Sequence, residues 1–109
     1  MRKSVISTTI KSGQVIPTPH ITFYRRPPSN DNDRLPKPVI IVSKKINLSA
    51  VVRHKYQRWI RELMKQIPNL PPHNYVLIAK PTINQVTSLS QLIDSIEPKL
   101  EELLNSKNQ

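Results

Sequence analysis

The sequence predicts an α+β domain, a two-layer sandwich in which helices cover one face of a sheet of three or four strands. Apolar residues recur at helical spacing in residues 49–67. Short runs rich in β-branched and aromatic residues occur at 20–26, 38–44 and 75–80. The length of 109 residues suits one domain, which we place over residues 1–109. The expected order of elements is roughly α-β-β-α-β-α.

The N-terminal part predicts a short helix and a strand. Residues 4–12 are weakly amphipathic, with Ile6 and Ile10 on one face, and Gly13 is a suitable helix stop. Residues 20–26 form a run of β-branched and aromatic residues between two prolines, which is typical of a strand.

The middle of the chain predicts two more strands. Residues 27–37 are rich in Pro, Asn and Asp and lack periodicity, so we expect a flexible, solvated hairpin tip. Residues 38–44 are almost continuously apolar, which indicates a strand that is buried on both faces or central in the sheet. Residues 75–80 predict a third buried strand.

Residues 49–67 predict an amphipathic helix with a basic outer face. Ser49 can cap the first turn, and Pro68 ends the helix because it lacks an N–H. The apolar residues fill an arc of roughly 140° with Trp59 near its centre, as expected of a core-facing stripe. Glu62 is the only acid between Arg53 and Lys65. Such a face suits simple solvation, but its arginines also match the geometry of phosphates.

The charge of the whole chain indicates a polyanionic partner. The net charge is +10 and the pI is about 10.3, a surplus that usually signals nucleic acid and less often an acidic membrane. No apolar run approaches the length of a spanning helix, and the N-terminus lacks a signal-peptide core. The absence of cysteine suits a reducing compartment. We therefore expect a cytoplasmic protein with no membrane partner.

The C-terminal part predicts a broken helix. Ser88 and Gln91 resemble a capping box, and Pro98 should kink or split the helical pattern that follows. Residues 106–109 are expected to be a frayed tail. The acidic side chains of this segment should face away from nucleic acid: Glu97, Glu101 and Glu102.

No motif for protein-based catalysis is present. The chain has no nucleophile triad order, no HExxH and no phosphate-binding glycine loop. Its histidines at 20, 54 and 73 lack the spacing of metal ligands, and Asp31 with Asp33 is too weak a signal for a metal site. We therefore assign no catalytic residue and no metal ligand to this chain.

The order of residues 42–62 resembles the signature of the bacterial ribonuclease P protein subunit. In that family a strand ends in V-S-K-K, and A-V-x-R-N-R/K-x-K-R-x-I-R-E follows after a short turn. This chain has VSKK at 42–45 and AVVRHKYQRWIRE at 50–62. His54 replaces the family's Asn, and Gln57 replaces its second Lys. The turn between the two parts lacks Gly and is one residue longer.

The resemblance implies a function and an unusual topology. The chain would bind the catalytic RNA and the 5′ leader of precursor tRNA, and would assist removal of the leader. Hydrolysis would be carried out by the RNA subunit with Mg²⁺, and the protein would be monomeric in the holoenzyme. The strands on either side of the basic helix would be joined by a left-handed crossover, against the usual right-handed rule.

The resemblance also assigns site residues. Tyr24 meets the family's spacing from Gly13, and with Arg25 and Arg26 it is expected to line a leader cleft. We expect this cleft between the Tyr24 face of the sheet and the Arg53 border of the helix. Ile6 and Ile10 stand where the family usually has Phe. The expected RNA-binding residues are Lys44, Lys45, Arg53, His54, Lys55, Gln57, Arg58, Arg61 and Lys65.

Two other functions remain open at this point. A small basic ribosomal protein, or a general RNA-binding protein with no processing role, would show the same charge. A DNA-binding module that places the basic helix in a major groove is a weaker alternative, because Tyr56 and Trp59 belong to the core side of that helix.

Overall fold

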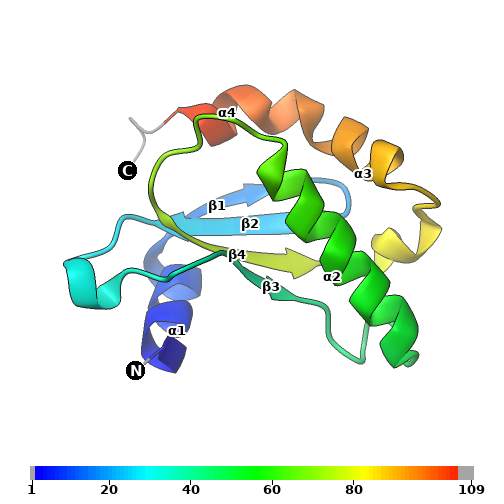
Figure 1. The fold of residues 1–109 in the computed structure, drawn as a ribbon, viewed down its shortest axis with the longest axis horizontal. Coiled ribbons are helices and arrows are strands. Elements are labelled where there is room, and N and C mark those ends of the chain that lie inside the picture. The colour runs from blue at the N-terminus through cyan, green and yellow to red at the C-terminus, as the bar shows by residue number, and fades with distance from the viewer. Residues whose placement is uncertain (1, 106–109) are drawn as a thin grey trace.

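The computed structural model describes residues 2–105 and shows one four-stranded sheet flanked by helices (Figure 1). The α+β architecture predicted from the sequence is confirmed, with β1 as the fourth strand, and the predicted tail at 106–109 lies outside the described residues. The helices are α1 (Arg2–Ser12), α2 (Ala50–Lys65), α3 (Leu89–Ile96) and α4 (Leu100–Leu104), and the strands are β1 (Gln14–Pro17), β2 (Ile21–Arg26), β3 (Val39–Ile41) and β4 (Asn74–Ala79).

The sheet has the strand order β1-β2-β4-β3. Strand β3 is a half-buried edge strand, so the prediction that residues 38–44 form a strand buried on both faces or central in the sheet is wrong. Strands β1 and β2 pair antiparallel, as do β2 and β4, whereas β3 and β4 are parallel. A parallel pair needs a crossover, and α2 provides it. With α2 toward the viewer and both strands running to the right, the chain passes upward from β3 to β4 in Figure 1. The crossover is therefore left-handed, as the resemblance implies.

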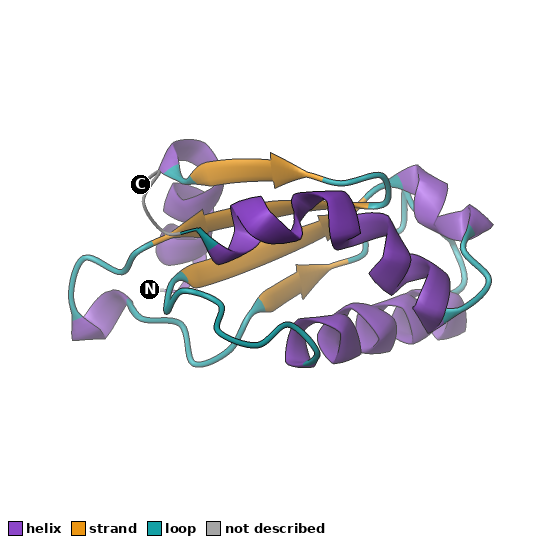
Figure 2. Ribbon diagram, turned by 90° about the horizontal axis from the view of Figure 1, so that it is seen from above, coloured by secondary structure: helices purple, strands orange, loops and turns teal. Residues whose placement is uncertain are grey.

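The hydrophobic core lies between one face of the sheet and helices α2, α3 and α4. Ile16, Phe23 and Leu77 stand side by side on this face and are completely buried. Figure 2 shows α3 and α4 crossing over the strands on this side. Burial of one large apolar side chain stabilises the fold by about 1.5–3 kcal/mol. The helices contribute these buried side chains: Tyr56, Ile60, Leu63, Met64, Leu92, Ile96 and Leu103.

The prediction that Trp59, near the centre of the apolar arc of α2, is a core residue is confirmed only in part. Trp59 is only partly buried and packs against the edge of the core, because the apolar arc of α2 is wider than the surface that the sheet and α3 cover. The Lys55 ammonium lies 5.1 Å from the centre of its ring, on the solvent side. Substitution of Trp59 should therefore destabilise the protein less than substitution of Ile60, which is completely buried.

Helix α1 lies on the other side of the sheet, so the prediction that all helices cover one face is wrong for this element. It packs against β2 and β4, and Thr9 is buried in that contact. Gly13 ends the helix as expected, and its N–H donates to the Thr9 carbonyl at 3.0 Å. A Cβ at this position would lie 2.6 Å from the Arg25 carbonyl oxygen, so only glycine fits the close approach of the two backbones.

Local signals in the sequence correctly located the helix ends. The Ser49 hydroxyl accepts from the Val52 N–H at 3.3 Å, and the Ser88 hydroxyl accepts from the Gln91 N–H at 3.2 Å. Pro98 splits the C-terminal helix into α3 and α4 through a 3₁₀ turn at Glu97–Lys99.

The loop at 27–37 is not the hairpin tip that was predicted, because β4 lies between β2 and β3 in the sheet, and the loop carries more structure than its composition indicated. It contains a 3₁₀ turn, Asp31–Asp33, whose first N–H groups are capped by the Asn30 side chain. The buried Asn74 side chain accepts from the Leu35 N–H at 2.8 Å and donates to the Asp33 carbonyl at 2.7 Å. Two hydrogen bonds therefore fix the second half of this loop to the start of β4.

Candidate nucleic-acid interface

The outer face of α2 presents a row of exposed basic side chains. His54, Arg58, Arg61 and Lys65 are exposed, while Lys55 and Gln57 are half-buried at its borders. Within residues 2–105, no Arg or Lys of α2 forms an ion pair with a carboxylate. The positive charges of this face are therefore uncompensated by the protein, which raises the attraction for an external anion.

The Arg53 side chain stabilises the turn that precedes α2. One of its guanidinium nitrogens donates to the carbonyls of Asn47 and Leu48, at 2.9 and 3.0 Å. The same turn is held by Asn47, whose side chain accepts from the Ser49 N–H at 2.9 Å. Arg53 thus fixes the turn that precedes α2, a role that its place in the motif did not indicate.

Lys55 is held against the aromatic side chains of its own helix. Its ammonium lies 5.4 Å from the Tyr56 ring centre and 5.1 Å from the Trp59 ring centre, within the range of a cation–π contact. The two rings lie 5.7 Å apart. Lys55 therefore presents a cation at a fixed place rather than on a freely moving side chain.

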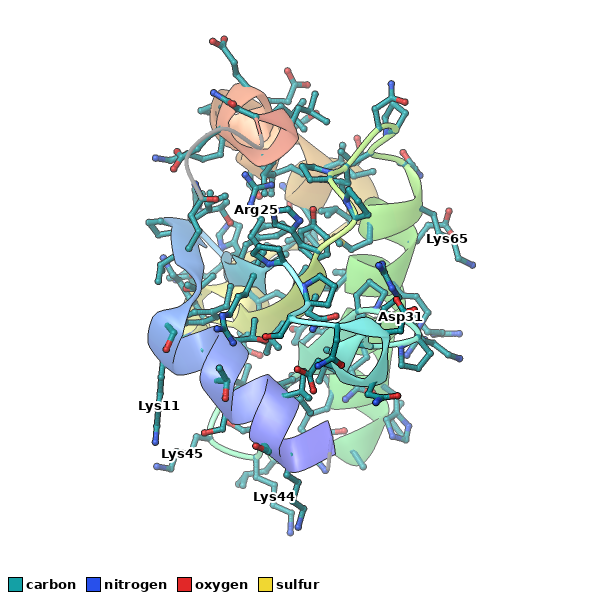
Figure 3. The ribbon with its side chains drawn as sticks, turned by 90° about the vertical axis from the view of Figure 1, so that its left-hand side faces the viewer. Lys11, Arg25, Asp31, Lys44, Lys45 and Lys65 are labelled. Atoms are coloured by element: carbon teal, nitrogen blue, oxygen red, sulfur yellow. The ribbon has the colours of Figure 1, made fainter. Side chains whose placement is uncertain are left out.

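A second basic group lies at the far end of β3. Lys44 and Lys45 are exposed in the turn after this strand, and Figure 3 shows both pointing to the same side of the molecule as Lys11 of α1. Lys65 points to a different side (Figure 3). Lys11 was not among the predicted residues, although its place in the last turn of the N-terminal helix, two residues before Gly13, was a usable signal.

The side chains of Tyr24 and Arg25 lie on opposite faces of the sheet. Successive side chains of a strand point to opposite sides, and burial along β2 alternates accordingly. Thr22, Tyr24 and Arg26 are half-buried on the α1 side, where Tyr24 stands between Val15 of β1 and Val76 of β4. Tyr24 and Arg26 are therefore accessible to a ligand on this side.

The assignment of Arg25 to a leader cleft is wrong. Arg25 lies on the core face beside Phe23 and is completely buried. Its guanidinium donates to the Gln14 side chain at 2.9 Å and to the carbonyls of Glu102 and Asn105 at 2.9 and 2.7 Å. It also donates to the carbonyl of Leu103. These carbonyls lie at the C-terminal end of α4, so Arg25 caps that end of the helix.

The prediction that the Arg53 border of α2 forms one wall of the leader cleft is also wrong. Helix α2 packs on the core side of the sheet, whereas Tyr24 faces the other side, so the Arg53 border does not stand opposite Tyr24. The element that packs on the Tyr24 side is α1, where Ile6 and Ile10 are half-buried. The surface with Tyr24 is therefore bounded by α1, and Figure 3 shows Lys44 and Lys45 pointing to the same side of the molecule as Lys11 of that helix.

The described residues contain no cluster of side chains that could hold a metal ion. Within them, no group of three His, Cys, Asp or Glu side chains could hold a metal ion, and no helix is long and apolar enough to cross a membrane. Burial, and then the charge of Lys80, lower the pKa of His20, whose ring lies 3.0 Å from the Thr82 hydroxyl. Both effects favour the neutral form of His20, which hydrogen-bonds to Thr82.

Comparison with known proteins identifies the family. A model of the ribonuclease P family, described as "Ribonuclease P", matches residues 1–104. The ribonuclease P protein of Staphylococcus aureus has a similar structure, with 24% identity, a TM-score of 0.77, and 96% of this chain and 95% of that chain covered.

The ribonuclease P protein of Thermotoga maritima, solved with 1-(4-fluorophenyl)-2-thiourea, has 18% identity, a TM-score of 0.73, and 96% of each chain covered. No match was found among curated proteins. The family match spans almost the whole chain, and the solved structures share its fold from end to end. The chain belongs to the ribonuclease P protein family.

Proposed function

We propose that this chain is the protein subunit of ribonuclease P, which binds the catalytic RNA and the 5′ leader of precursor tRNA and assists removal of the leader. Family membership places it in a ribonucleoprotein with a role in tRNA processing. The observation that carries the finer proposal is the uncompensated basic face of α2, which coincides with the family signature at 50–62.

In this proposal the outer face of α2 and the surface that carries Tyr24 and Arg26 bind different parts of the RNA. The outer face of α2 binds the folded catalytic RNA through phosphate contacts, with His54 and Gln57 as polar neighbours of the arginines. The surface that carries Tyr24 and Arg26 binds the single-stranded leader, since an aromatic ring beside cations accepts both bases and phosphates. The proposal expects a cytoplasmic, monomeric protein in the holoenzyme, and expects hydrolysis and Mg²⁺ binding in the RNA subunit.

A general RNA-binding protein, such as a small ribosomal protein, is the second candidate. The basic face of α2 favours it to the same degree, because phosphate contacts carry no sequence information. The two candidates are separated by competition. If the proposed function is correct, labelled catalytic RNA should stay bound to the protein in an excess of ribosomal RNA at physiological salt. Equal displacement by ribosomal RNA would favour the second candidate.

Replacement of Arg58 by alanine should reduce the salt dependence of RNA binding without changing the fold. Arg58 is exposed and forms no ion pair with a described carboxylate, so its only expected task is a phosphate contact. Each lost contact should flatten the plot of log K against log salt concentration by about 0.7–0.9. The matched control is Arg34→Ala, which removes an exposed arginine from the 27–37 loop. A slope that changes equally in both variants would contradict a special role for α2.

A further inference from the structure

A pocket lies beside the C-terminal half of α2, and the proposed function does not involve it. Its volume is about 580 Å³, within the range of small-molecule sites. Its walls are formed by the second half of α2, the loop before β3 and the connection at 66–73. The apolar part of the lining includes Leu35, Ile40, Met64, Leu70, Pro72 and Tyr75.

The walls of this pocket are held in place by the fold. Asn69 has a φ of 64°, in the left-handed region that Asn tolerates, and this turns the chain directly after Pro68. The Tyr75 hydroxyl donates to the Pro71 carbonyl at 2.7 Å, and the His73 ring stacks on Tyr75 with ring centres 6.2 Å apart. On the opposite wall, Asn74 fixes the Leu35 backbone. The pocket is therefore formed before any ligand binds, which lowers the entropic cost of binding.

The rim of the pocket is positively charged. Lys37, Arg61 and Lys65 line it, and no Asp or Glu is among the lining residues. Arg61 and Lys65 lie one turn apart on the outer face of α2, and Lys65 points into solvent (Figure 3). The pocket therefore opens beside the surface that the proposed function assigns to RNA.

We propose that this pocket binds one unpaired nucleotide of a bound RNA, a proposal that rests on the RNA-binding function above. The base would enter the apolar cavity, and its phosphate would contact the cations of the rim. An unstacked base has two flat apolar faces, and sequence-specific recognition of RNA by proteins depends mainly on such extruded bases. A ligand that combines a flat apolar group with a phosphate matches both the lining and the charge of this site.

The test uses adenosine 5′-monophosphate, with ribose 5-phosphate as the same anion without a base. Both are titrated into the full chain while NMR follows the methyl groups of Met64 and Leu70. Adenosine monophosphate should shift these signals and bind about tenfold more tightly than ribose 5-phosphate, the scale of one base stacked on protein side chains. Equal affinities, or signals that do not move, would overturn the proposal.

Two variants keep the test decisive. Pro72→Trp places a large side chain at the exposed edge of the pocket and should abolish the preference for the base. The matched control, Leu104→Trp, adds the same side chain on α4, where Leu104 is 42% exposed, and should keep it. If Pro72→Trp fails to fold, Lys37→Glu reverses one rim charge and should weaken adenosine monophosphate binding about tenfold.

The same samples separate this proposal from the proposed function. If precursor tRNA binds with its normal salt dependence while adenosine monophosphate does not, only the pocket proposal fails. If no RNA binds, the proposed function fails as well. An acidic, leucine-containing peptide that shifts the Met64 signal where the nucleotide does not would assign the pocket to a protein partner and overturn the proposal.

Discussion

Replacement of Arg25 by methionine should lower the free energy of unfolding by about 3–5 kcal/mol. The side chain is completely buried and donates to Gln14 and to the carbonyls that end α4. A buried polar group left without its partner costs about 1–3 kcal/mol. Arg25→Met removes the guanidinium from the buried Leu103 carbonyl and from the half-buried Gln14 side chain, and it removes the cap from the end of α4. Since small domains are stable by only about 5–15 kcal/mol, this loss is a large part of the total. Urea denaturation followed by circular dichroism measures it.

Arg26→Met is the matched control for this prediction. Arg26 is the next residue of β2, but it lies half-buried on the α1 side of the sheet. Its replacement should change stability by less than about 1 kcal/mol, as is usual for substitutions outside the core. Equal losses in the two variants, or a loss below about 1 kcal/mol for Arg25→Met, would contradict the structural role of Arg25.

Tyr75 provides a second readout of Arg25. Burial raises the pKa of the Tyr75 hydroxyl above its ordinary value of 10.0, and the neighbouring Arg25 charge acts in the opposite direction. Removal of that charge should raise the pKa of Tyr75 further. A raised pKa means that the tyrosine contributes stability below pH 10, which is lost as the pH rises through its folded pKa. Ultraviolet titration of the two variants should therefore show later ionisation in Arg25→Met.

Replacement of Tyr24 by alanine should weaken binding of precursor tRNA to the reconstituted enzyme by about 1–3 kcal/mol, the contribution of one base stacked on an aromatic ring. Mature tRNA lacks the leader, so its affinity should be almost unchanged. Tyr24 faces away from the core, which makes loss of the fold an improbable cause of the effect. The measurement is the ratio of the two affinities at fixed salt concentration.

Tyr24→Phe is the control for stacking, because it keeps the ring and removes only the hydroxyl. It should bind precursor tRNA almost as well as the unchanged protein. Equal weakening of precursor and mature tRNA by Tyr24→Ala would show that Tyr24 supports general RNA contact or the fold. Tyr24 would then have no part in leader binding.

The elements of the fold could be predicted because local signals agreed with one another. The caps at Ser49 and Ser88, the break at Pro98 and the stop at Gly13 each have a local physical cause, and the structure confirms all four. The handedness of the crossover has no such local cause. It depends on how α2 packs on the sheet, and only the resemblance to a family supplied it.

The candidate site was predicted less completely, and Arg25 shows why. A basic residue beside Tyr24 was read as part of the same surface, although alternation along a strand places it on the opposite face. The strand pattern alone, with Ile21, Phe23 and Arg25 on one side, contained that signal. The carbonyls that Arg25 caps lie almost eighty positions later in the chain, so its partners could not be inferred.

Reconstitution with the cognate catalytic RNA at low Mg²⁺ concentration tests the central claim most directly. Cleavage of precursor tRNA is measured with and without the protein, and the account predicts a clear increase in kcat/KM when the protein is added. This increase should fall when Arg58 or Tyr24 is replaced by alanine, and should persist in Arg34→Ala. A protein that leaves cleavage unchanged, yet binds ribosomal RNA tightly, would contradict the account.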